Sequence, residues 1–459
     1  MGSTRSRYAL ILAAGKGTRF KSEKPKVLHE ICGKPMICYL LDRLPELQVE
    51  KAIIVVGQGA EEVQNALQGY PVEFVRQEQQ LGTGHAVMSA VPALNGLDGN
   101  LIVLYGDTPL IQTSALEELF VKQETTGADE VLLTVQLDNP TGYGRILRDS
   151  AGQIFDIIEE KETTEEQRRI LEVNAGFVCF GIKALVGTIS QLSNENVAGE
   201  YYLTDMVKVL RRNGRRVETV QVEAADEEIF GINDRRQLAA AAVKLRSRIN
   251  TRWMEEGVTL IDPNSTVIDS TVEIGPDTMI HPGAIIEGKT KIGKDCRIGA
   301  YVHLANAQLA DGATVDSFSV IRNSRVQSGA VVGPFAHLRG ETEVGASVRI
   351  GSFVELKKTV VGSQSIAAHL SYLGDATIGE GVNVGAGAIT CNFDGAKKHD
   401  TIIEDGAFIG SDSQLVAPVR VGKNAVVAAG STVTEDVPEE ALAIARSRQT
   451  NKAGWTKKG

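Results

Sequence analysis

The C-terminal half of the chain carries a hydrophobic pattern that repeats every six residues. A branched or long aliphatic residue returns in three successive registers between Ile268 and Thr434. They contain Ile268, Ile274, Ile280, Ile286, Ile292, Ile298 and Leu304, then Val326, Val332, Leu338, Val344, Ile350 and Leu356, then Ile403, Ile409, Leu415, Val421, Val427 and Val433. A helix repeats about every 3.6 residues and a strand about every 2, so the longer period needs a repeated unit of strand and turn. The pattern predicts a β-solenoid whose aliphatic side chains fill its axis.

Glycine follows the aliphatic residue in many repeats, at Gly275, Gly293, Gly299, Gly333, Gly345, Gly351, Gly379, Gly385, Gly410 and Gly422. Because glycine accepts a positive φ, we expect these glycines to turn the chain at the corners between short strands. A β-sandwich with accidental periodicity is the alternative. A solenoid by itself indicates architecture and not function, because the same scaffold can serve catalysis or spacing.

The N-terminal half alternates apolar runs with amphipathic stretches. Strands that are apolar throughout and alternate with helices are typical of a parallel sheet covered on both faces. We therefore predict an α/β, Rossmann-like domain with a mostly parallel sheet, whose ligands gather at the carboxyl ends of the strands. The expected strands are 8–13, 52–56, 72–76, 101–105, 130–136 and 177–180, and the expected helices include 61–67, 84–91 and 114–124.

A helical pattern covers residues 232–254, with one apolar face formed by Leu238, Ala242, Leu245, Ile249 and Trp253. Neither glycine nor proline interrupts it before Gly257, which predicts one long helix. The predicted domains are the sheet domain at 1–231, the linker helix at 232–252 and the solenoid at 253–459, with a polar tail from about 436. The tail is either a flexible terminus or an arm that packs on a neighbouring chain.

Composition narrows the classes of partner. The net charge of −10 argues against binding to nucleic acid or to an anionic membrane, so an anionic substrate needs a local basic cluster. The five cysteines show no CxxC or Cys/His metal spacing and are typical of reduced thiols. No apolar run approaches the length of a membrane span, and the start of the chain is too polar for a signal peptide. We expect a soluble, cytoplasmic protein.

The loop after the first expected strand combines glycine with cations. It reads LAAGKGTR from Leu12 to Arg19 and is followed by KPK, which ends at Lys26. Glycines beside a strand end let backbone N–H groups approach a phosphate, and Arg19 and Lys26 supply mobile positive charge. The spacing matches neither the GK[ST] of a P-loop nor the third glycine of GxGxxG. It predicts a phosphate site of another kind, with a purely structural turn as the alternative.

These residues resemble the signature of the sugar-nucleotide pyrophosphorylases, which join a nucleoside triphosphate to a sugar 1-phosphate and release pyrophosphate. Further matching motifs follow in order: QLGTGHA at 80–86, YGDTPL at 105–110, TGYGRI at 141–146, IIEEK at 157–161, NAG at 174–176 and GIND at 231–234. With the solenoid, the set is similar to the family of bifunctional N-acetylglucosamine-1-phosphate uridyltransferases and glucosamine-1-phosphate acetyltransferases. The similarity covers nearly the whole chain and implies a left-handed parallel β-helix of hexapeptide repeats, an exception to the usual crossover handedness.

Asp107 follows the apolar strand 101–105, so we expect its carboxylate in the cleft, where a hard oxygen suits Mg²⁺. A turn-forming aspartate is the alternative. The resemblance implies that Asp107 and Asn233 hold Mg²⁺, although Asn233 is also a good N-cap unless Asp234 takes that role. It also implies that Lys26 and Arg19 are catalytic. The implied contacts with UTP and the nucleotide sugar are Leu12, Ala13, Ala14, Gly15, Lys26, Gln77, Gly82, Thr83, Tyr105, Gly106, Asp107, Gly144, Glu159, Asn174 and Asn233.

Two interruptions break the hexapeptide period, AAHLSYLGD at 367–375 and TCNFDGAKKHD at 390–400. Insertions into a solenoid form surface loops, where function collects. His369 lies in the first interruption, and an imidazole that titrates near neutral pH is suited to take a proton from an acceptor amine. A surface histidine without a catalytic role is the alternative.

In acetyltransferases of the resembling type, the residue that matches His369 is the general base. The resemblance implies contacts with glucosamine 1-phosphate at Arg339, Lys357, Tyr372 and Asn383, and with acetyl coenzyme A at Ala386, Asn392, Phe393, Ser411, Ala429 and Arg446. Phe393 departs from the family, where tyrosine is expected, so a hydroxyl hydrogen bond there is lost or supplied otherwise. The resemblance further implies a homotrimer in which each acetyl site lies where neighbouring prisms meet.

The predicted function is that of a bifunctional enzyme. Its solenoid would acetylate glucosamine 1-phosphate with acetyl coenzyme A, and its sheet domain would convert N-acetylglucosamine 1-phosphate and UTP to UDP-N-acetylglucosamine and pyrophosphate. One alternative is a monofunctional nucleotidyltransferase with a structural or regulatory β-helix, which His369 beside Arg339 and Lys357 disfavours. Another is an assembly scaffold with a degenerate nucleotide site, which the intact Lys26 and Asp107 disfavour.

Overall fold

The computed structural model describes residues 5–223, 229 and 231–455 of the 459-residue chain. The chain forms two compact units, Met1–Leu245 and Arg246–Gly459. The expected long helix is present as α7 (Arg235–Glu255), and the boundary between the units falls inside it.

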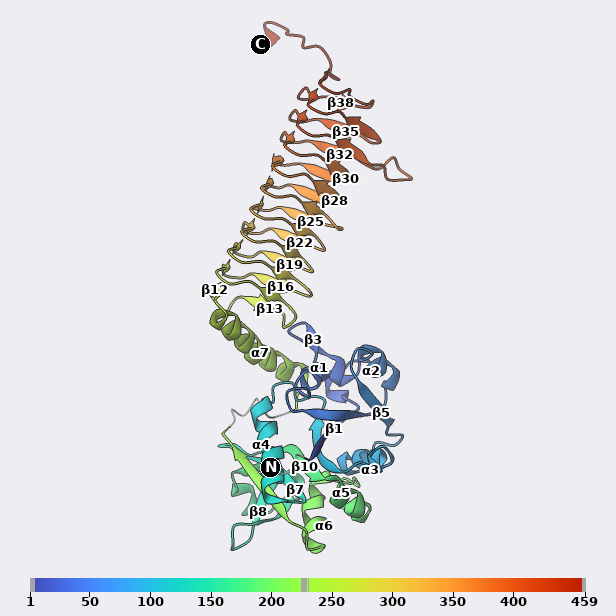
Figure 1. The fold of residues 1–459 in the computed structure, drawn as a ribbon, viewed down its shortest axis with the longest axis vertical. Helices are drawn as coiled ribbons and strands as arrows, with labels where there is room; N and C mark the ends of the chain where they lie inside the picture. The colour runs from blue at the N-terminus through green and yellow to red at the C-terminus, as the bar shows by residue number, and fades with distance from the viewer. Residues whose placement is uncertain (1–4, 224–228, 230, 456–459) are drawn as a thin grey trace. The chain divides into compact units, whose positions relative to one another are not determined.

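The first unit is built on a sheet with the strand order β11-β7-β10-β6-β1-β4-β5 (Figure 1). These strands are β1 (Ser6–Ala13), β4 (Val49–Val56), β5 (Val72–Arg76), β6 (Gly99–Tyr105), β7 (Glu130–Gln136), β10 (Glu172–Gly181) and β11 (Val217–Val222). Neighbours pair in parallel except for β10, which runs antiparallel to β6 and β7. The mostly parallel sheet and all the strands expected from the sequence are confirmed.

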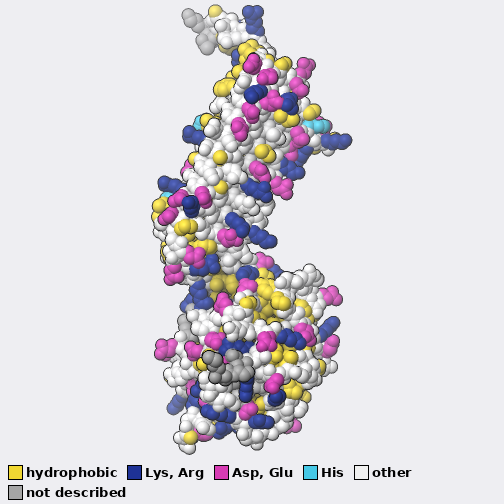
Figure 2. Space-filling model, in the orientation of Figure 1, with side chains coloured by type: hydrophobic (Ala, Val, Ile, Leu, Met, Phe, Trp, Pro, Cys, Tyr) yellow, Lys and Arg dark blue, Asp and Glu magenta, His cyan; other side chains and the backbone are white. Residues whose placement is uncertain are grey.

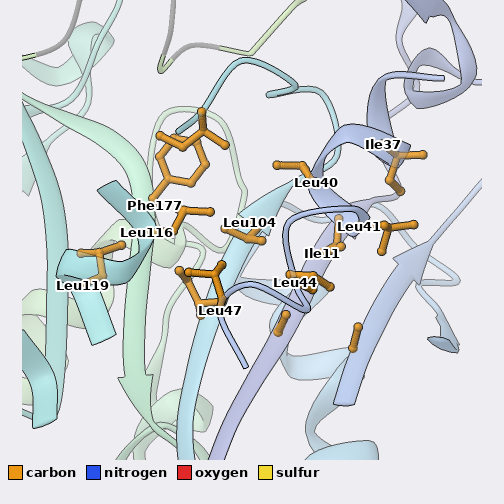
Figure 3. Packing of buried hydrophobic residues seen from close by; sticks show 14 of the residues in the cluster. Ile11, Ile37, Leu40, Leu41, Leu44, Leu47, Leu104, Leu116, Leu119 and Phe177 are labelled. Atoms are coloured by element: carbon orange, nitrogen blue, oxygen red, sulfur yellow. The ribbon is translucent and has the colours of Figure 1, made fainter. Parts of the chain in front are cut away.

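Helices cover both faces of this sheet. They are α1 (Met36–Leu41), α2 (Ala60–Ala66), α3 (Thr83–Leu94), α4 (Thr113–Thr126), α5 (Ile182–Thr188) and α6 (Met206–Arg212). Alternate residues of β1 enter different apolar clusters: Ile11 packs in the cluster that contains α1 and α4, and Leu10 in the cluster that contains α3, α5 and α6. Figure 3 shows the first cluster, in which Leu116 and Phe177 lie near Leu104.

Two short strands, β8 (Arg145–Arg148) and β9 (Ile154–Ile158), form a hairpin beside β10. The sequence analysis did not propose them, nor α1, α5 and α6, because their apolar runs are too short to show a period. This hairpin matters for the site, since Gly144 precedes β8 and Glu159 follows β9.

The second unit is a solenoid of stacked coils (Figure 1). Its strands pair in parallel at an offset of one coil, as in Val267 with Ile285 and Glu273 with Lys291. Columns of strands begin at β12 (Thr259–Leu260), β13 (Val267–Ile268) and β14 (Glu273–Ile274). The sixth-position aliphatic side chains fill the interior: Ile280 and Ile298 are both 0% exposed. The predicted parallel β-helix is confirmed, with one hexapeptide on each side of a coil.

The strands that carry candidate residues are β25 (His337–Arg339), β28 (Glu355–Val361), β29 (Ile366–His369), β30 (Tyr372–Ile378), β31 (Asn383–Val384) and β32 (Ile389–Cys391). The expected tail begins with one more rung, because β39 (Leu442–Ala443) pairs with β37 (Val426–Val427). Residues 456–459 of that tail lie outside the described residues. Within 5–223 and 231–455, none of the helices combines the length and hydrophobicity needed to span a membrane.

The corner glycines act differently from the prediction. Among those expected to turn the chain, all of which the structure describes, only Gly333 has a positive φ, at 110°. A Cβ on Gly345 would lie 2.8 Å from the backbone nitrogen of Ser363 in the next coil, closer than such atoms approach. Positive φ falls two residues later instead, as at Ser347 (φ 58°). These glycines are therefore required because adjacent coils pack closely, and the predicted conformational reason was wrong.

Candidate active sites

A cleft of about 400 Å³ opens at the carboxyl ends of β1, β5 and β6 in the first unit. Its lining contains Leu12, Ala13, Ala14, Gly15, Lys16, Lys26, Val27, Gln77, Gln80, Gly82, Thr83, Ala86, Tyr105, Asp107 and Glu200. The parallel strands place these loops at one edge of the sheet, which is where such sheets bind ligands. The cleft thus gathers Leu12 to Gly15, Lys26, Gln77, Gly82, Thr83, Tyr105 and Asp107 from the predicted set.

Close backbone packing shapes the floor of this cleft. The Gly106 N–H donates to the Leu12 carbonyl at 3.0 Å, which ties the end of β6 to the end of β1. Gly82 has φ 106°, and a Cβ there would lie 2.6 Å from the Tyr201 carbonyl oxygen. Gln77 is 4% exposed, and its amide donates to the Gly82 carbonyl at 3.2 Å. The loops that face the cleft are therefore held by contacts that larger residues would break.

Lys26, Asp107 and Asn233 meet at one end of the cleft. The Lys26 ammonium forms an ion pair with Asp107 and donates to the Asn233 side-chain oxygen at 2.8 Å. Lys26 and Asp107 are mostly buried, with side chains 13% and 17% exposed. Residues more than two hundred positions apart in the chain are thus brought to a single point.

The donor set suits a divalent cation. Asp107 and Asn233 direct a carboxylate and an amide oxygen at the same cationic group, the Lys26 ammonium. The competing role of Asn233 is taken by Asp234, whose Oδ1 accepts from the N–H groups of Arg236 (2.8 Å) and Gln237 (2.9 Å) and so caps α7. The described residues contain no cluster of three His, Cys, Asp or Glu side chains suited to a metal. A small hard cation that takes few protein oxygens and fills its shell with phosphate and water fits this pair.

A second group of predicted residues lies around the hairpin of β8 and β9. The Asn174 N–H donates to the Gly144 carbonyl at 2.9 Å, and a Cβ on Gly144 would lie 3.7 Å from Glu159 Oε1. Thr204 donates to the same Glu159 oxygen at 3.1 Å. Burial raises the pKa of Glu159 above its usual value, which marks a carboxyl partly withdrawn from water. Gly144, Glu159 and Asn174 are therefore brought together, as predicted from motifs far apart in sequence.

Tyr105 connects this group to the cleft. Its side chain is partly buried, and desolvation raises the pKa of the hydroxyl, followed in effect by the charges of Glu159 and Asp107. Thr83 hydrogen-bonds to the same hydroxyl, and the tyrosine ring passes 3.4 Å from where a Cβ of Gly176 would stand. Tyr105 therefore lies in the cleft lining and within electrostatic reach of Glu159, so it links the cleft to the β8–β9 hairpin.

Sequence analysis missed three polar residues of the cleft lining, Lys16, Gln80 and Glu200. Lys16 and Gln80 stand inside the motifs LAAGKGTR and QLGTGHA and could have been proposed from them. Glu200 belongs to no recognised motif, and only the fold brings it near Gly82. Arg19, predicted to be catalytic, is exposed on the 3-10 turn Thr18–Phe20 and lies outside this lining.

In the second unit, strand register stacks the predicted phosphate-binding cations. Arg339 of β25 pairs directly with Lys357 of β28. Each cation has a carboxylate partner: Arg339 binds Glu355 at 2.7 Å and Lys357 binds Asp375 at 3.2 Å. Both positive groups are therefore held in place on one outward face of the solenoid.

Asp375 is the residue that sequence analysis missed here, although it ends the quoted interruption AAHLSYLGD. Its Oδ2 accepts from Lys357 and, at 2.5 Å, from the Asn392 amide. The Asn392 amide also lies 3.4 Å from the Tyr372 hydroxyl. Asp375 thus joins Lys357, a predicted sugar-phosphate residue, to Asn392, a predicted coenzyme A residue that also contacts Tyr372.

His369 lies at the end of β29 and is exposed. Its backbone is fixed, since it pairs with Ser352 and its carbonyl accepts from the Ser371 hydroxyl at 2.9 Å. In the part of the chain that the structure describes, no hydrogen bond to its ring was found. Asn383 lies in the same column, where it pairs with Ile366 of the His369 strand. The backbone of His369 is therefore held at a corner of the solenoid, and its side chain is exposed.

Four of the predicted coenzyme A residues lie on successive coils along that corner: Ala386, Ser411, Ala429 and Arg446. The Asp412 N–H donates to the Ala386 carbonyl at 2.7 Å, and the Gly430 N–H donates to the Ser411 carbonyl at 2.8 Å. Arg446 donates to the Ala429 carbonyl at 2.8 Å and so closes the column. The column therefore presents the small side chains of Ala386, Ser411 and Ala429 at successive coils.

The second interruption forms a loop that leaves the coils beyond β32 (Figure 1). Phe393 and Lys398 pair across it, and Phe393 is 59% exposed. A hydrogen bond with Lys357, followed by the charge of that cation, lowers the pKa of Lys398, so the loop brings a further cation to Lys357. Acidic and basic side chains are otherwise intermixed on the face drawn in Figure 2, so such local clusters decide where anions bind.

Family models match three segments of the chain. A MobA-like NTP transferase domain covers residues 9–175, a GMPPB C-terminal domain covers 264–366, and a hexapeptide repeat of succinyl-transferase covers 400–435. Among solved structures, a UDP-glucose pyrophosphorylase complexed with UDP-glucose covers 53% of this chain and 99% of its own, at 19% identity and a TM-score of 0.44.

Curated relatives align along almost the whole chain and carry the name bifunctional protein GlmU. Those of Shouchella clausii and Brevibacillus brevis are 48% identical over 98% of this chain and cover 99% and 97% of their own length. That of Carboxydothermus hydrogenoformans is 49% identical over 98% of this chain and 99% of its own. The match spans both units, so the chain belongs to the GlmU family of bifunctional proteins, in which an NTP transferase domain precedes hexapeptide repeats.

Proposed function

We propose that this bifunctional transferase makes UDP-N-acetylglucosamine in two steps, one in each unit. The observation that carries the proposal is the presence of two separate constellations. Lys26, Asp107 and Asn233 converge in the cleft of the first unit. Arg339 and Lys357 lie in register on the second unit, whose corner presents His369. The proposed domains are 1–231 for uridylyl transfer and 253–459 for acetyl transfer, joined by the linker helix at 232–252.

In the proposed acetyl step, Arg339 and Lys357 hold the phosphate of glucosamine 1-phosphate, with Tyr372 and Asn383 on the sugar. His369 takes a proton from the amine as its nitrogen attacks the thioester carbonyl of acetyl coenzyme A. The new C–N bond forms, the C–S bond breaks, and coenzyme A leaves as the thiol. Ala386, Ser411, Ala429 and Arg446 hold the cofactor along the corner, where the backbone column gives them a common line.

In the proposed uridylyl step, a phosphate oxygen of N-acetylglucosamine 1-phosphate attacks the α-phosphorus of UTP in line, and pyrophosphate leaves. The loop Leu12 to Gly15, with Gln77, Gly82 and Thr83, holds the nucleotide, and Gly144, Glu159 and Asn174 hold the sugar. Lys26 and Arg19 neutralise phosphate charge, so catalysis consists of positioning and electrostatic stabilisation. Asp107 and Asn233 would hold the divalent cation, which we propose is Mg²⁺ and which polarises the phosphate oxygens.

The assembly that we propose is a homotrimer. The support is the hexapeptide repeat together with the position of His369, which is exposed at a corner of the solenoid. Phe393 stands where the family places tyrosine, and its exposed ring remains able to pack against the cofactor.

One incubation tests the assignment. The purified chain is supplied with glucosamine 1-phosphate, acetyl coenzyme A, UTP and Mg²⁺, and every product is identified by mass. We expect UDP-N-acetylglucosamine, pyrophosphate and free coenzyme A, and without Mg²⁺ only the acetylated sugar phosphate. Consumption of UTP only when N-acetylglucosamine 1-phosphate is supplied ready-made would favour a monofunctional nucleotidyltransferase with a structural solenoid.

A further inference from the structure

The wall of the cleft in the first unit contains a glutamine whose side-chain amide is held in one orientation. Gln77 directly follows β5, and its Nε2 lies 3.2 Å from the Gly82 carbonyl oxygen and 3.0 Å from Nδ1 of His85. A carbonyl oxygen can only accept a hydrogen bond, so the end of the amide that faces Gly82 is the NH₂ group. The same NH₂ group donates to His85, which requires that Nδ1 of this histidine carries no proton.

His85 is the stronger of these two constraints on the amide. It is the nearer acceptor, and the Gly82 carbonyl is shared with the Ala86 N–H, which donates to it at 3.1 Å. His85 lies in the first turn of α3, and its ring lies near that of Tyr201, with the ring centroids 6.1 Å apart. The histidine of the motif QLGTGHA, which sequence analysis did not assign to the site, therefore presents an acceptor to Gln77 from a defined position.

The two bonds of the NH₂ group leave the side-chain oxygen of Gln77 for a ligand. Within the part of the chain that the structure describes, nothing donates to this oxygen, and it is not among the buried polar atoms that lack a partner. Gln77 is 4% exposed and lines the cleft, so the oxygen reaches solvent only there. A nucleotide in the cleft therefore meets Oε1 as a fixed hydrogen-bond acceptor.

A fixed acceptor distinguishes between the pyrimidine bases. Uracil has a carbonyl oxygen on C4 and a proton on N3, whereas cytosine has an amino group on C4 and a lone pair on N3. Oε1 of Gln77 can accept from N3–H of uracil, but it would meet the N3 lone pair of a cytosine seated in the same way. If the amide turned over, its NH₂ group would face the base and this preference would be reversed.

We propose that His85 is a positioning residue that selects uracil over cytosine. Its Nδ1 holds the NH₂ group of Gln77 away from the base, so that the Gln77 oxygen meets N3–H. The inference deepens the proposed uridylyl step and rests on it.

The test compares uridylyl transfer with UTP against cytidylyl transfer with CTP in the full chain, as the ratio of the two kcat/KM values. His85→Phe removes the acceptor and keeps a ring beside Tyr201, and His85→Leu removes both. In each variant we expect the ratio to fall about tenfold, mainly through a higher KM for UTP. His85→Asn places a side-chain oxygen near the position of Nδ1 and should restore most of the parental ratio. Acetyl transfer should stay at the parental rate throughout.

The matched control is Ser89→Ala, which removes a hydrogen bond to the His85 carbonyl on the same helix and leaves Nδ1 untouched. It should leave the ratio unchanged. In a chain that already carries Gln77→Ala, His85→Phe should have no further effect on the ratio, because the histidine acts through that amide.

The outcomes separate this inference from the proposed function. A parental chain that consumes neither UTP nor CTP overturns the proposed uridylyl step. A parental chain that prefers UTP, with an unchanged ratio in His85→Phe or in His85→Leu, whichever folds, overturns the role of His85 alone. His85→Asn with the ratio of His85→Phe would assign the effect to packing and would also overturn that role. The urea unfolding transition of the first unit shows which variants are folded.

Discussion

The two units bring their candidate site residues together in different ways. In the first unit, the loops of a parallel sheet enclose a cleft, and residues from distant parts of the chain, such as Lys26 and Asn233, meet inside it. In the second unit, coil stacking aligns residues about one coil apart, such as Arg339 and Lys357, on an open surface. The first site is finished by folding, whereas the second is exposed until something covers it. A substitution at one site should therefore lower the activity of that site and leave the other activity unchanged. The variants below test this expectation.

The largest expected effect comes from His369→Ala. Loss of a general base lowers the rate by about 10²–10⁴-fold, so acetyl transfer should fall by that factor while uridylyl transfer persists. The two half-reactions are assayed separately, by release of coenzyme A and by release of pyrophosphate. His303→Ala, on the same solenoid but bound to Glu287 at 2.8 Å, is the control and should leave both rates unchanged. Equal loss of both activities in His369→Ala would contradict the division of labour.

The reciprocal variant is Asp107→Ala. It removes the carboxylate that pairs with Lys26, and we expect uridylyl transfer to fall by about 10²–10³-fold with acetyl transfer intact. Titration with Mg²⁺ should show that the residual activity needs more of the cation than the parental chain does. Asp98→Ala removes an exposed carboxylate that pairs with Lys183 at 2.5 Å and serves as the control. An unchanged Mg²⁺ dependence would argue against Asp107 as a metal ligand.

The fold was predictable because its signals are local. The six-residue period named interior residues such as Ile280 and Ile298, and both are fully buried. The role of the corner glycines was mistaken because the contact that needs them, as between Gly345 and Ser363, joins adjacent coils and leaves no mark in either hexapeptide. Periodicity reports which residues face inward, and it does not report how closely one coil approaches the next.

The site residues also fall into those that the sequence predicts and those that only the fold reveals. The family resemblance pointed to Gln77 and the motif YGDTPL pointed to Asp107, and the fold brings both to one cleft. Sequence analysis did not identify Glu200 and Asp375, because the role of each depends on a contact that the fold creates. Glu200 packs against Gly82, and Asp375 links Lys357 to Asn392. Such contacts depend on loop geometry and strand register, which no spacing in the sequence specifies.

Asp375→Asn tests whether Asp375 acts in substrate binding or in the chemical step of the proposed acetyl site. The amide keeps the shape but removes the charge that holds Lys357, so we expect the KM for glucosamine 1-phosphate to rise about tenfold, in line with the loss of one charge-assisted bond. The kcat should change less, because Asp375 contacts binding residues and not His369. Asp394→Asn, in the nearby loop and paired with His399, is the control. A fall in kcat at unchanged KM would assign Asp375 a role in the chemical step instead.

Gly345→Ala tests the coil contact without touching either site. The added Cβ would meet the Ser363 nitrogen and the Val361 carbonyl oxygen at 2.8 Å, and overpacking of this kind destabilises by about 1–3 kcal/mol. The loss should appear in the unfolding transition of the solenoid, followed by denaturant titration, and not in that of the first unit. Gly69→Ala, where a Cβ meets nothing within 4 Å, is the control. A solenoid of unchanged stability would show that the coils can separate slightly at no cost.

Glu130→Gln makes the corresponding test in the first unit. Glu130 begins β7, is 0% exposed, and within the described residues neither carboxyl oxygen has a hydrogen-bond partner. Burial raises the pKa of this carboxyl well above its usual 4.5. Between those two values the unfolded chain releases the proton and the folded chain keeps it, so the stability of the parental unit falls as pH rises.

The amide of Glu130→Gln has no proton to lose, so the variant should gain stability relative to the parental chain as pH rises from about 4.5. Urea titrations at a series of pH values measure the difference in the free energy of unfolding between the variant and the parental chain. The unfolding transition of the first unit is the one that is followed. Glu195→Gln changes an exposed carboxylate and should show no such trend. A difference that stays constant with pH would mean that Glu130 finds a partner on ionisation. The first unit would then rearrange locally to give a buried carboxylate a hydrogen-bond partner, although in this structure both carboxyl oxygens lack one.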